Sequence, residues 1–194
     1  NGVAPVAKRR DPLLNAAERH EFFRRLQAAN PRPTTELYFR NHFELLADGD
    51  QFFPRILAAI DQATHFIDIE MYLFESGHTA NRFISALSAA IERGVHIRLL
   101  VDYSGSYGLN QHDVMLLQQR GVELRFFNRM RHHNLIRNLS RDHRKIITID
   151  RQIAFTGGAG ITDEFSPTTP GKIACRELMV EIHGPVVTDC QILL

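Results

Sequence analysis

Short apolar runs alternate with helical patterns along most of this 194-residue chain, and that alternation limits the possible folds more than any other feature. The strand-like runs are HFELLAD, HFIDIEMYLF, VHIRLLVDY and VELRFF, and segments with helical spacing separate them at residues 50–63, 79–93 and 111–120. Gly94 and Gly121 follow two of these segments, as expected at helix C-termini. Strands that alternate with helices predict an α/β fold with a mixed, largely parallel sheet flanked by helices on both faces.

The first 39 residues have a different pattern. Residues 1–12 contain two prolines and a basic trio and predict disorder, residues 13–29 have helical apolar spacing, and NPRPTTE predicts a proline-rich linker. We therefore expect an N-terminal extension over residues 1–39 and an α/β domain over residues 40–194. The chain does not begin with Met and ends inside an expected helix near Pro185, so we expect a truncated part of a longer protein.

The sequence argues against a membrane-spanning protein and against a small disulfide-stabilised one. No run of about 18 apolar residues is present, so no part of the sequence predicts a membrane-spanning helix. Cys175 and Cys190 are too few for a disulfide framework, which favours a reducing compartment.

Positive charge is concentrated in one window, from Arg125 to Lys145. This window contains seven basic residues and one acidic residue, a net charge of +6, whereas the net charge of the whole chain is +1. Such a window is either a solvated basic loop or a landing site for an anion such as a phosphate, a lipid headgroup or nucleic acid. Both interpretations remain open on charge alone.

The stretch SRDHRKIITID places His143 and Lys145 two residues apart at the start of a strand-like run. Residues two apart in a strand project from the same face, with Cα atoms roughly 6–7 Å apart. That separation suits two side chains that grip one phosphoryl group, the imidazole attacking phosphorus and the ammonium holding an oxygen. Asp150, seven residues after His143, falls on the opposite face by the same alternation, so we expect it to serve the turn rather than the histidine.

Two glycines follow at positions that a hairpin would place beside His143. If Asp150–Arg151 forms a two-residue turn, Ile149 pairs with Gln152 and His143 pairs with the second residue of Gly157–Gly158. The absence of Cβ atoms there would let backbone N–H groups approach an anion closely. A lone His and Lys on a strand are often surface residues, but the glycines in register favour a phosphoryl site.

These residues resemble the phospholipase D superfamily, whose signature is HxKxxxxD followed by a Gly-Gly or Gly-Ser turn. The similarity extends upstream, because NHFELLADGDQFFPRILAAIDQATHFIDIEMYLFES and HDVMLLQQRGVELRFFN resemble segments of bacterial cardiolipin synthases. The resemblance covers roughly residues 40–194 and implies one half of a phospholipase D-like fold. It also implies a cytoplasmic protein, peripheral on the inner membrane.

The resemblance assigns roles to individual residues. It implies that His143 is the nucleophile that forms a phosphohistidine, or its acid and base partner, that Lys145 neutralises phosphate oxygens, and that Asp150 is structural. Glu177 matches a carboxylate that orients the histidine. Residues expected near the substrate phosphate are Gly157, Gly158, Arg144 and Glu70, where Glu70 can alternatively cap a strand end. No metal or other cofactor is implied.

Two positions depart from the family pattern. Gly160 stands where the family usually has Asn, which puts one phosphate contact in doubt, and Arg151 replaces the glycine of the family's Asp-Gly turn.

The chain contains a single HxK motif, whereas catalysis in this superfamily uses two that face each other. The second site would come from a missing C-terminal half or from a second copy of the chain. The implied function is a phosphatidyltransferase that moves a phosphatidyl group from a phosphatidylglycerol-like lipid to an alcohol. The alternatives are a phosphodiesterase that acts as a dimer on nucleic acid, a less favoured partner, and an inactive anion-binding half-domain.

Overall fold

A computed structural model describes residues 40–129, 141–166 and 174–192. The expected N-terminal helix, its linker and residues 130–140 of the basic window lie outside these ranges. The elements in chain order are β1 (His42–Ala47), α3 (Gly49–Gln62), β2 (Phe66–Met71), α4 (His78–Glu92), β3 (His96–Asp102), α5 (Gln111–Arg120), β4 (Glu123–Phe127), β5 (Lys145–Ile149), β6 (Ile153–Gly157), the 3₁₀ turn η1 (Asp163–Phe165), β7 (Leu178–His183) and α7 (Val186–Ile192).

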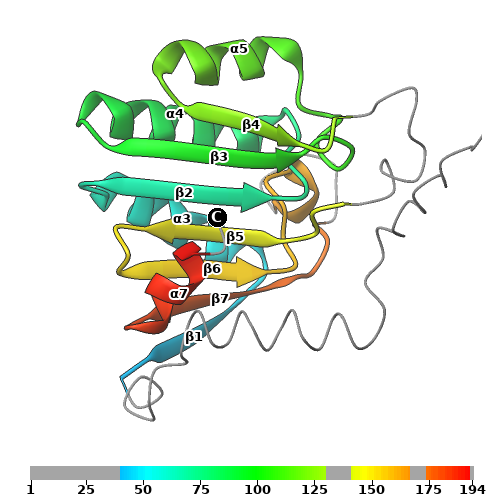
Figure 1. The fold of residues 1–194 in the computed structure, drawn as a ribbon. Helices are drawn as coiled ribbons and strands as arrows, with labels where there is room; N and C mark the ends of the chain where they lie inside the picture. Colours follow the sequence, from blue (N-terminus) through cyan, green and yellow to red (C-terminus); the bar gives the residue numbers. More distant parts are fainter. Residues whose placement is uncertain (1–39, 130–140, 167–173, 193–194) are drawn as a thin grey trace, which may run out of the picture. The chain divides into compact units, whose positions relative to one another are not determined.

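The seven strands of the described ranges form one mixed sheet in the order β1-β7-β6-β5-β2-β3-β4 (Figure 1). This confirms the expected α/β fold, but parallel pairing is less extensive than the alternation suggested. Only β2–β3 and β3–β4 are parallel, because α4 and α5 return the chain to the same end of the sheet. The β5–β6 hairpin, β7 beside it and β1 at the edge add four antiparallel pairings.

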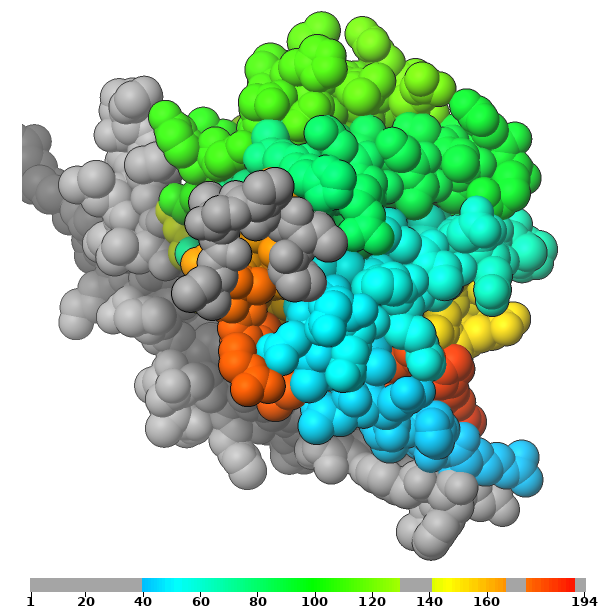
Figure 2. All heavy atoms as spheres, turned by 180° about the vertical axis from the view of Figure 1, so that it is seen from behind, coloured from blue at the N-terminus to red at the C-terminus, as the bar shows by residue number. Residues whose placement is uncertain are grey.

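Helices lie on both faces of the sheet, as the sequence predicts. α3 and α4 cover the back face, where spheres of both helices spread over the sheet in Figure 2. The main core lies between these two helices and the sheet. It includes Phe52, Phe83, Ile69 and Leu99, each no more than 1% exposed. On the front face α7 packs over β6 and β7, through Val187 against Ala154 and Ile182.

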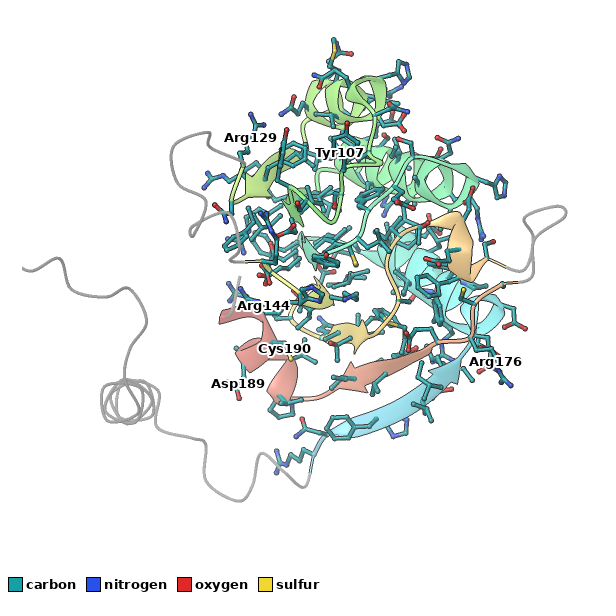
Figure 3. All side chains as sticks on the ribbon, turned by 90° about the vertical axis from the view of Figure 1, so that its right-hand side faces the viewer. Tyr107, Arg129, Arg144, Arg176, Asp189 and Cys190 are labelled. Carbon is teal, nitrogen blue, oxygen red and sulfur yellow. The ribbon has the colours of Figure 1, made fainter. Side chains whose placement is uncertain are left out.

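Strand β5 therefore occupies the centre of the sheet, with β2 on one side and the β6 return on the other. Its first residues meet the carboxyl ends of β2 and β6 at one edge of the sheet, and Figure 3 looks at that edge.

Candidate active site

Lys145 begins β5 and His143 lies two residues before it, and both side chains contact the same neighbour, Tyr72. The His143 and Tyr72 rings are stacked, with centroids 3.9 Å apart and planes 22° apart. The Lys145 ammonium lies 5.1 Å from the centroid of the Tyr72 ring and donates a 3.2 Å hydrogen bond to the His143 carbonyl. The predicted pair is thus brought together, and His143 is exposed at the sheet edge.

Tyr72 was missed by the sequence reasoning. It follows β2 directly, and its N–H donates to the Arg144 carbonyl at 3.0 Å, one residue beyond the β2–β5 ladder. The run IEMYLF contains the tyrosine, but only the antiparallel pairing of β2 with β5 places it beside the histidine.

Asp150 lies at the far end of β5 and ties the hairpin turn to the start of β2. Its carboxylate accepts hydrogen bonds from the N–H groups of Thr64, His65 and Phe66 at 2.7–2.8 Å, and from the Thr64 hydroxyl at 2.8 Å. Partial burial acts to raise the pKa of Asp150, but these hydrogen bonds outweigh it and lower the pKa below the ordinary value. These contacts fix the turn to β2, and the structural role of Asp150 stays a prediction.

The hairpin register differs by one residue from the predicted one. Ile149 pairs with Ile153 instead of Gln152, although the Gln152 N–H still donates to the Ile149 carbonyl at 3.0 Å. Asp150 and Arg151 occupy the turn as expected, with φ of 51° and 58°, but Gln152 adds a third residue to the connection. Continued along the strands, this register sets Lys145 opposite Gly157.

Glu177 lies beside the glycine return. A Cβ atom on Gly158 would overlap the Glu177 carboxylate, so the glycine lets that side chain lie directly against the backbone here. Glu177 Oε1 accepts a 2.9 Å hydrogen bond from the Leu178 N–H. Within the described ranges no hydrogen bond joins Glu177 to His143, and its orienting role stays a prediction.

Arg144 and Glu70 do not join this group, because they project from the front face of the sheet. Arg144 Nη2 lies 2.6 Å from Glu70 Oε1, and Arg144 Nε donates to Asp142 Oδ1 at 3.0 Å. Burial and the neighbouring Asp142 raise the pKa of Glu70 to about 8, while Arg144 opposes the shift. Arg144 thus binds carboxylates of its own chain, and its expected phosphate contact has no support from this geometry.

Asp142 connects this front-face cluster to the neighbouring strand. Its N–H donates to Asp102 Oδ2 at 3.0 Å, and Asp102 Oδ1 accepts from the N–H groups of Ser104 and Gly105 at 2.9 Å. Although burial acts to raise the pKa of Asp142, hydrogen bonds from Glu70 and Arg144 lower it. The residues on both sides of His143 are therefore held in place.

Gly160, where the family usually has Asn, has no room for a side chain. A Cβ atom there would lie 2.5 Å from the Leu73 carbonyl oxygen and 2.7 Å from the Leu73 Cβ. The close approach allows Ile161 N–H to donate to the Leu73 carbonyl at 2.9 Å and Glu75 N–H to donate to the Ile161 carbonyl at 3.0 Å. Glycine at 160 thus serves backbone packing in this chain.

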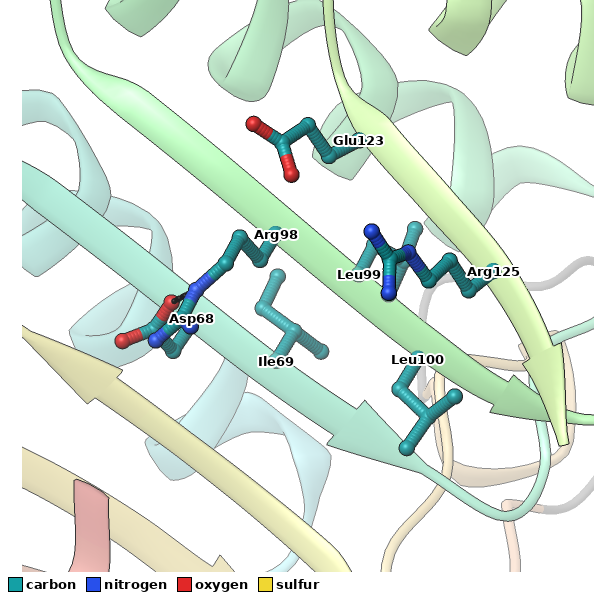
Figure 4. A pocket seen from close by; sticks show the side chains of 7 residues that line it. All are labelled: Asp68, Ile69, Arg98, Leu99, Leu100, Glu123 and Arg125. Atoms are coloured by element: carbon teal, nitrogen blue, oxygen red, sulfur yellow. Dashed lines mark hydrogen bonds and ion pairs between the residues drawn. The ribbon is translucent and has the colours of Figure 1, made fainter. Parts of the chain in front are cut away.

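A hollow of about 280 Å³ lies on the front face, away from the motif (Figure 4). Arg98 Nε contacts Asp68 Oδ1 at 2.6 Å within it, and this hydrogen bond raises the pKa of Arg98. Its lining residues are Asp68, Ile69, Arg98, Leu99, Leu100, Glu123 and Arg125. None of them belongs to the predicted catalytic set.

Neither a metal-binding cluster nor a membrane-spanning helix occurs among the described residues. No group of three or more His, Cys, Asp or Glu side chains in these ranges could hold a metal ion. No helix in the same ranges has the length and apolar character needed to cross a bilayer.

A mixed α/β sheet with a His-Lys pair at the start of its central strand, a tethered turn aspartate and a glycine return defines a phospholipase D-like half-domain. The family model described as "Cardiolipin synthase, PLD-like domain" matches residues 56–189, and the chain belongs to that family. The resemblance read from the motif is thereby confirmed.

Curated relatives carry cardiolipin synthase names. Cardiolipin synthase B of Salmonella typhi is 36% identical over 151 residues, which cover 77% of this chain and 36% of the relative. Cardiolipin synthase 1 of Bacillus cereus is 32% identical over 153 residues, which cover 78% of this chain and 30% of the relative. The chain therefore spans about a third of the length of these proteins.

Solved structures share the fold. The phospholipase D family member Nuc of Salmonella typhimurium has a TM-score of 0.59 at 20% identity, covering 79% of this chain and 90% of Nuc. Phosphatidylserine synthase of Haemophilus influenzae Rd KW20 has a TM-score of 0.62 at 13% identity, covering 78% of this chain and 35% of that protein.

Proposed function

We propose that this chain supplies one catalytic half of a phosphatidyltransferase of the cardiolipin synthase type. The observation that carries the proposal is the exposed His143 imidazole with the Lys145 ammonium held next to it at the sheet edge. Relatives named cardiolipin synthase, at up to 36% identity, support the substrate class. The substrates would be a phosphatidylglycerol-like lipid and an alcohol acceptor.

In the first step His143 attacks the lipid phosphorus, so a P–N bond forms while the P–O bond to the leaving alcohol breaks. The leaving oxygen takes a proton from the histidine of a second HxK site. Lys145 would neutralise the non-bridging oxygens, whereas the Gly158 N–H already donates to the Leu178 carbonyl at 3.2 Å. Glu177 would hold the imidazole in the reactive tautomer.

In the second step the acceptor hydroxyl attacks the phosphohistidine, gives its proton to the second-site histidine and releases His143. A single HxK motif provides the nucleophile or the acid, but not both. We therefore propose that the second half comes either from further sequence or from a second copy across a two-fold axis. The working enzyme would lie at the cytoplasmic face of the inner membrane, in peripheral contact with lipid.

A lipid assay tests this function on a protein with both HxK sites, which is either a dimer of this chain or a longer protein that contains it. Phosphatidylglycerol vesicles are the substrate, released glycerol and cardiolipin are quantified, and light scattering gives the oligomeric state. His143→Ala is expected to lower turnover at least about 10³-fold, as for loss of a positioned nucleophile. The control is His112→Asn, since the His112 side chain is 83% exposed on α5 and outside the motif. Unchanged turnover by the His143 variant would refute the mechanism.

The alternative substrate is nucleic acid, and the net +6 window over residues 125–145 favours it. Of the window's described residues, Arg141 lies 3.8 Å from Asp102, and Arg144 contacts both Glu70 and Asp142. These internal contacts reduce the charge available to a phosphate backbone, so we rank nucleic acid second. Cleavage of single-stranded DNA without lipid turnover would reverse that ranking, and anion binding without either activity would indicate an inactive half-domain.

A further inference from the structure

Tyr72 contacts both chemical groups of the motif, the His143 imidazole and the Lys145 ammonium. Its ring is stacked against His143 at 3.9 Å between centroids, and the Lys145 ammonium lies 5.1 Å from the same ring's centre. One aromatic ring thus contacts the two side chains that must act on one phosphorus atom. Tyr103, which directly follows the neighbouring strand β3, contacts Phe126 instead, so a tyrosine after a strand end has no general need to touch the motif.

The backbone around Tyr72 is fixed independently of the motif side chains. Its N–H donates to the Arg144 carbonyl at 3.0 Å, and its carbonyl accepts from Ser106 Oγ at 3.1 Å. Ser106 Oγ also accepts from the Phe74 N–H at 3.1 Å, and Ser106 is 2% exposed. Because β5 on one side and a buried serine on the other hold Tyr72, its ring can act as a firm support for exposed side chains.

We propose that Tyr72 is a positioning residue that sets the orientation of His143 and Lys145; this role rests on the proposed phosphoryl-transfer function. Stacking covers the flat face of the imidazole and leaves its nitrogen edges exposed, and a nitrogen edge is what must reach phosphorus. The ring also attracts the ammonium without consuming its hydrogen-bond donors. Lys145 is thereby kept beside the His143 carbonyl and remains free to bind a phosphate oxygen.

Three variants separate this role from simple packing. Tyr72→Phe keeps the ring and removes the hydroxyl, Tyr72→Leu removes the ring, and Tyr103→Leu is the matched control. We expect Tyr72→Phe to stay within about 3-fold of wild-type kcat. Tyr72→Leu should lose about 10- to 100-fold in kcat, because small misplacements of a reacting group cost that much. Tyr103→Leu should be unchanged, and melting temperatures identify any variant that fails to fold.

Two readouts on the purified chain do not depend on turnover. The imidazole proton signals of His143, assigned by their absence in His143→Asn, should lie upfield in wild type and Tyr72→Phe and move downfield in Tyr72→Leu. Inorganic phosphate affinity should fall about 2- to 5-fold in Tyr72→Leu, since a Lys–aromatic contact at an exposed site is worth about that factor.

The outcomes distinguish this proposal from the proposed function. If Tyr72→Leu keeps both the wild-type kcat and the wild-type chemical shifts of His143, while His143→Ala is inactive, the positioning role is wrong and the function stands. If His143→Ala remains active, the function fails, and the imidazole shifts and phosphate affinity still decide whether Tyr72 holds the pair. Loss of activity in Tyr72→Phe as large as in Tyr72→Leu would overturn the role assigned to the ring.

Discussion

Asp150 joins the β5–β6 turn to the start of β2, and replacing it by Ala is the sharpest test of its structural role. The substitution removes a carboxylate that accepts four hydrogen bonds: three from backbone N–H groups and one from the Thr64 hydroxyl. It also places Ala at φ 51°, where L-residues other than Asn and Asp are disfavoured. Both effects destabilise the fold, and neither touches the sheet edge where His143 lies.

The expected loss follows from the contacts. Four hydrogen bonds to a charged acceptor at about 1 kcal/mol each, discounted because the donors can reach water, give about 3 kcal/mol in the free energy of unfolding. For a domain of this size that corresponds to a fall of about 6–12 °C in melting temperature. Asp150→Gly should recover about 1 kcal/mol of the loss by relieving the positive φ. Asp150→Asn should cost less than Ala, because it keeps one acceptor oxygen.

Urea unfolding of the three variants between pH 2.5 and 7 provides the assay. The pKa of Asp150 is lowered in the folded state, so its contribution is complete above about pH 4 and is lost as the pH falls through the folded-state pKa. The wild-type advantage over Asp150→Ala should therefore shrink at acid pH. An Ala variant that is equally stable at pH 7, or that loses turnover per folded molecule as severely as His143→Ala, would refute the structural reading.

Three further substitutions follow from backbone and charge. Arg151→Gly should stabilise the chain by about 0.5–1 kcal/mol, because Arg151 has a φ of 58°; a lower melting temperature would mean that its contact with Phe66 outweighs the strain. Gly160→Ala should cost about 1–3 kcal/mol in urea unfolding, since its Cβ would press on Leu73, and a neutral result would show that the loop shifts freely. Glu70 has its pKa raised to about 8, so the folded state holds a proton that the unfolded chain releases above its ordinary pKa of 4.5, and stability falls as pH rises between these values. Glu70→Gln should therefore gain stability relative to wild type between pH 5.5 and 8.5, with exposed Glu92→Gln as the control; parallel profiles for both variants would contradict the raised pKa.

Much of the fold could be predicted because each element satisfies local rules. Helix α5 was predicted over residues 111–120, with Gly121 at its end, and it spans that range with Gly121 in the left-handed region at φ 101°. The sheet's antiparallel half was underestimated because strand–helix alternation says nothing about where β5 inserts. Its place beside β2 is a long-range pairing that leaves no periodic signal in the sequence.

The sequence predicted the part of the candidate site that comes from the single segment around β5. His143 and Lys145 share a neighbour, as alternation requires, whereas Arg144 was assigned to the phosphate only because it is basic and adjacent in sequence. The predicted pairing of His143 with Gly158 was wrong by one residue, since the turn type, and with it Gln152, could not be read from Asp150–Arg151 alone. Tyr72 belongs to another strand and needed the fold.

Alternation along β5 explains why the motif has the spacing that it has. His143 and Lys145 project toward Tyr72 and the glycine return, while the residues between and before them, Arg144 and Asp142, project toward Glu70 on the other face. The contacts of Arg144 and Asp142 on one face therefore fix the backbone of the His-Lys pair, and the exposed imidazole lies on the opposite face. A slip of one residue would exchange the two sets and bury the histidine against the carboxylates. The tethered Asp150 opposes that slip from the far end of the strand, which is how a residue remote from the phosphorus belongs to the same motif.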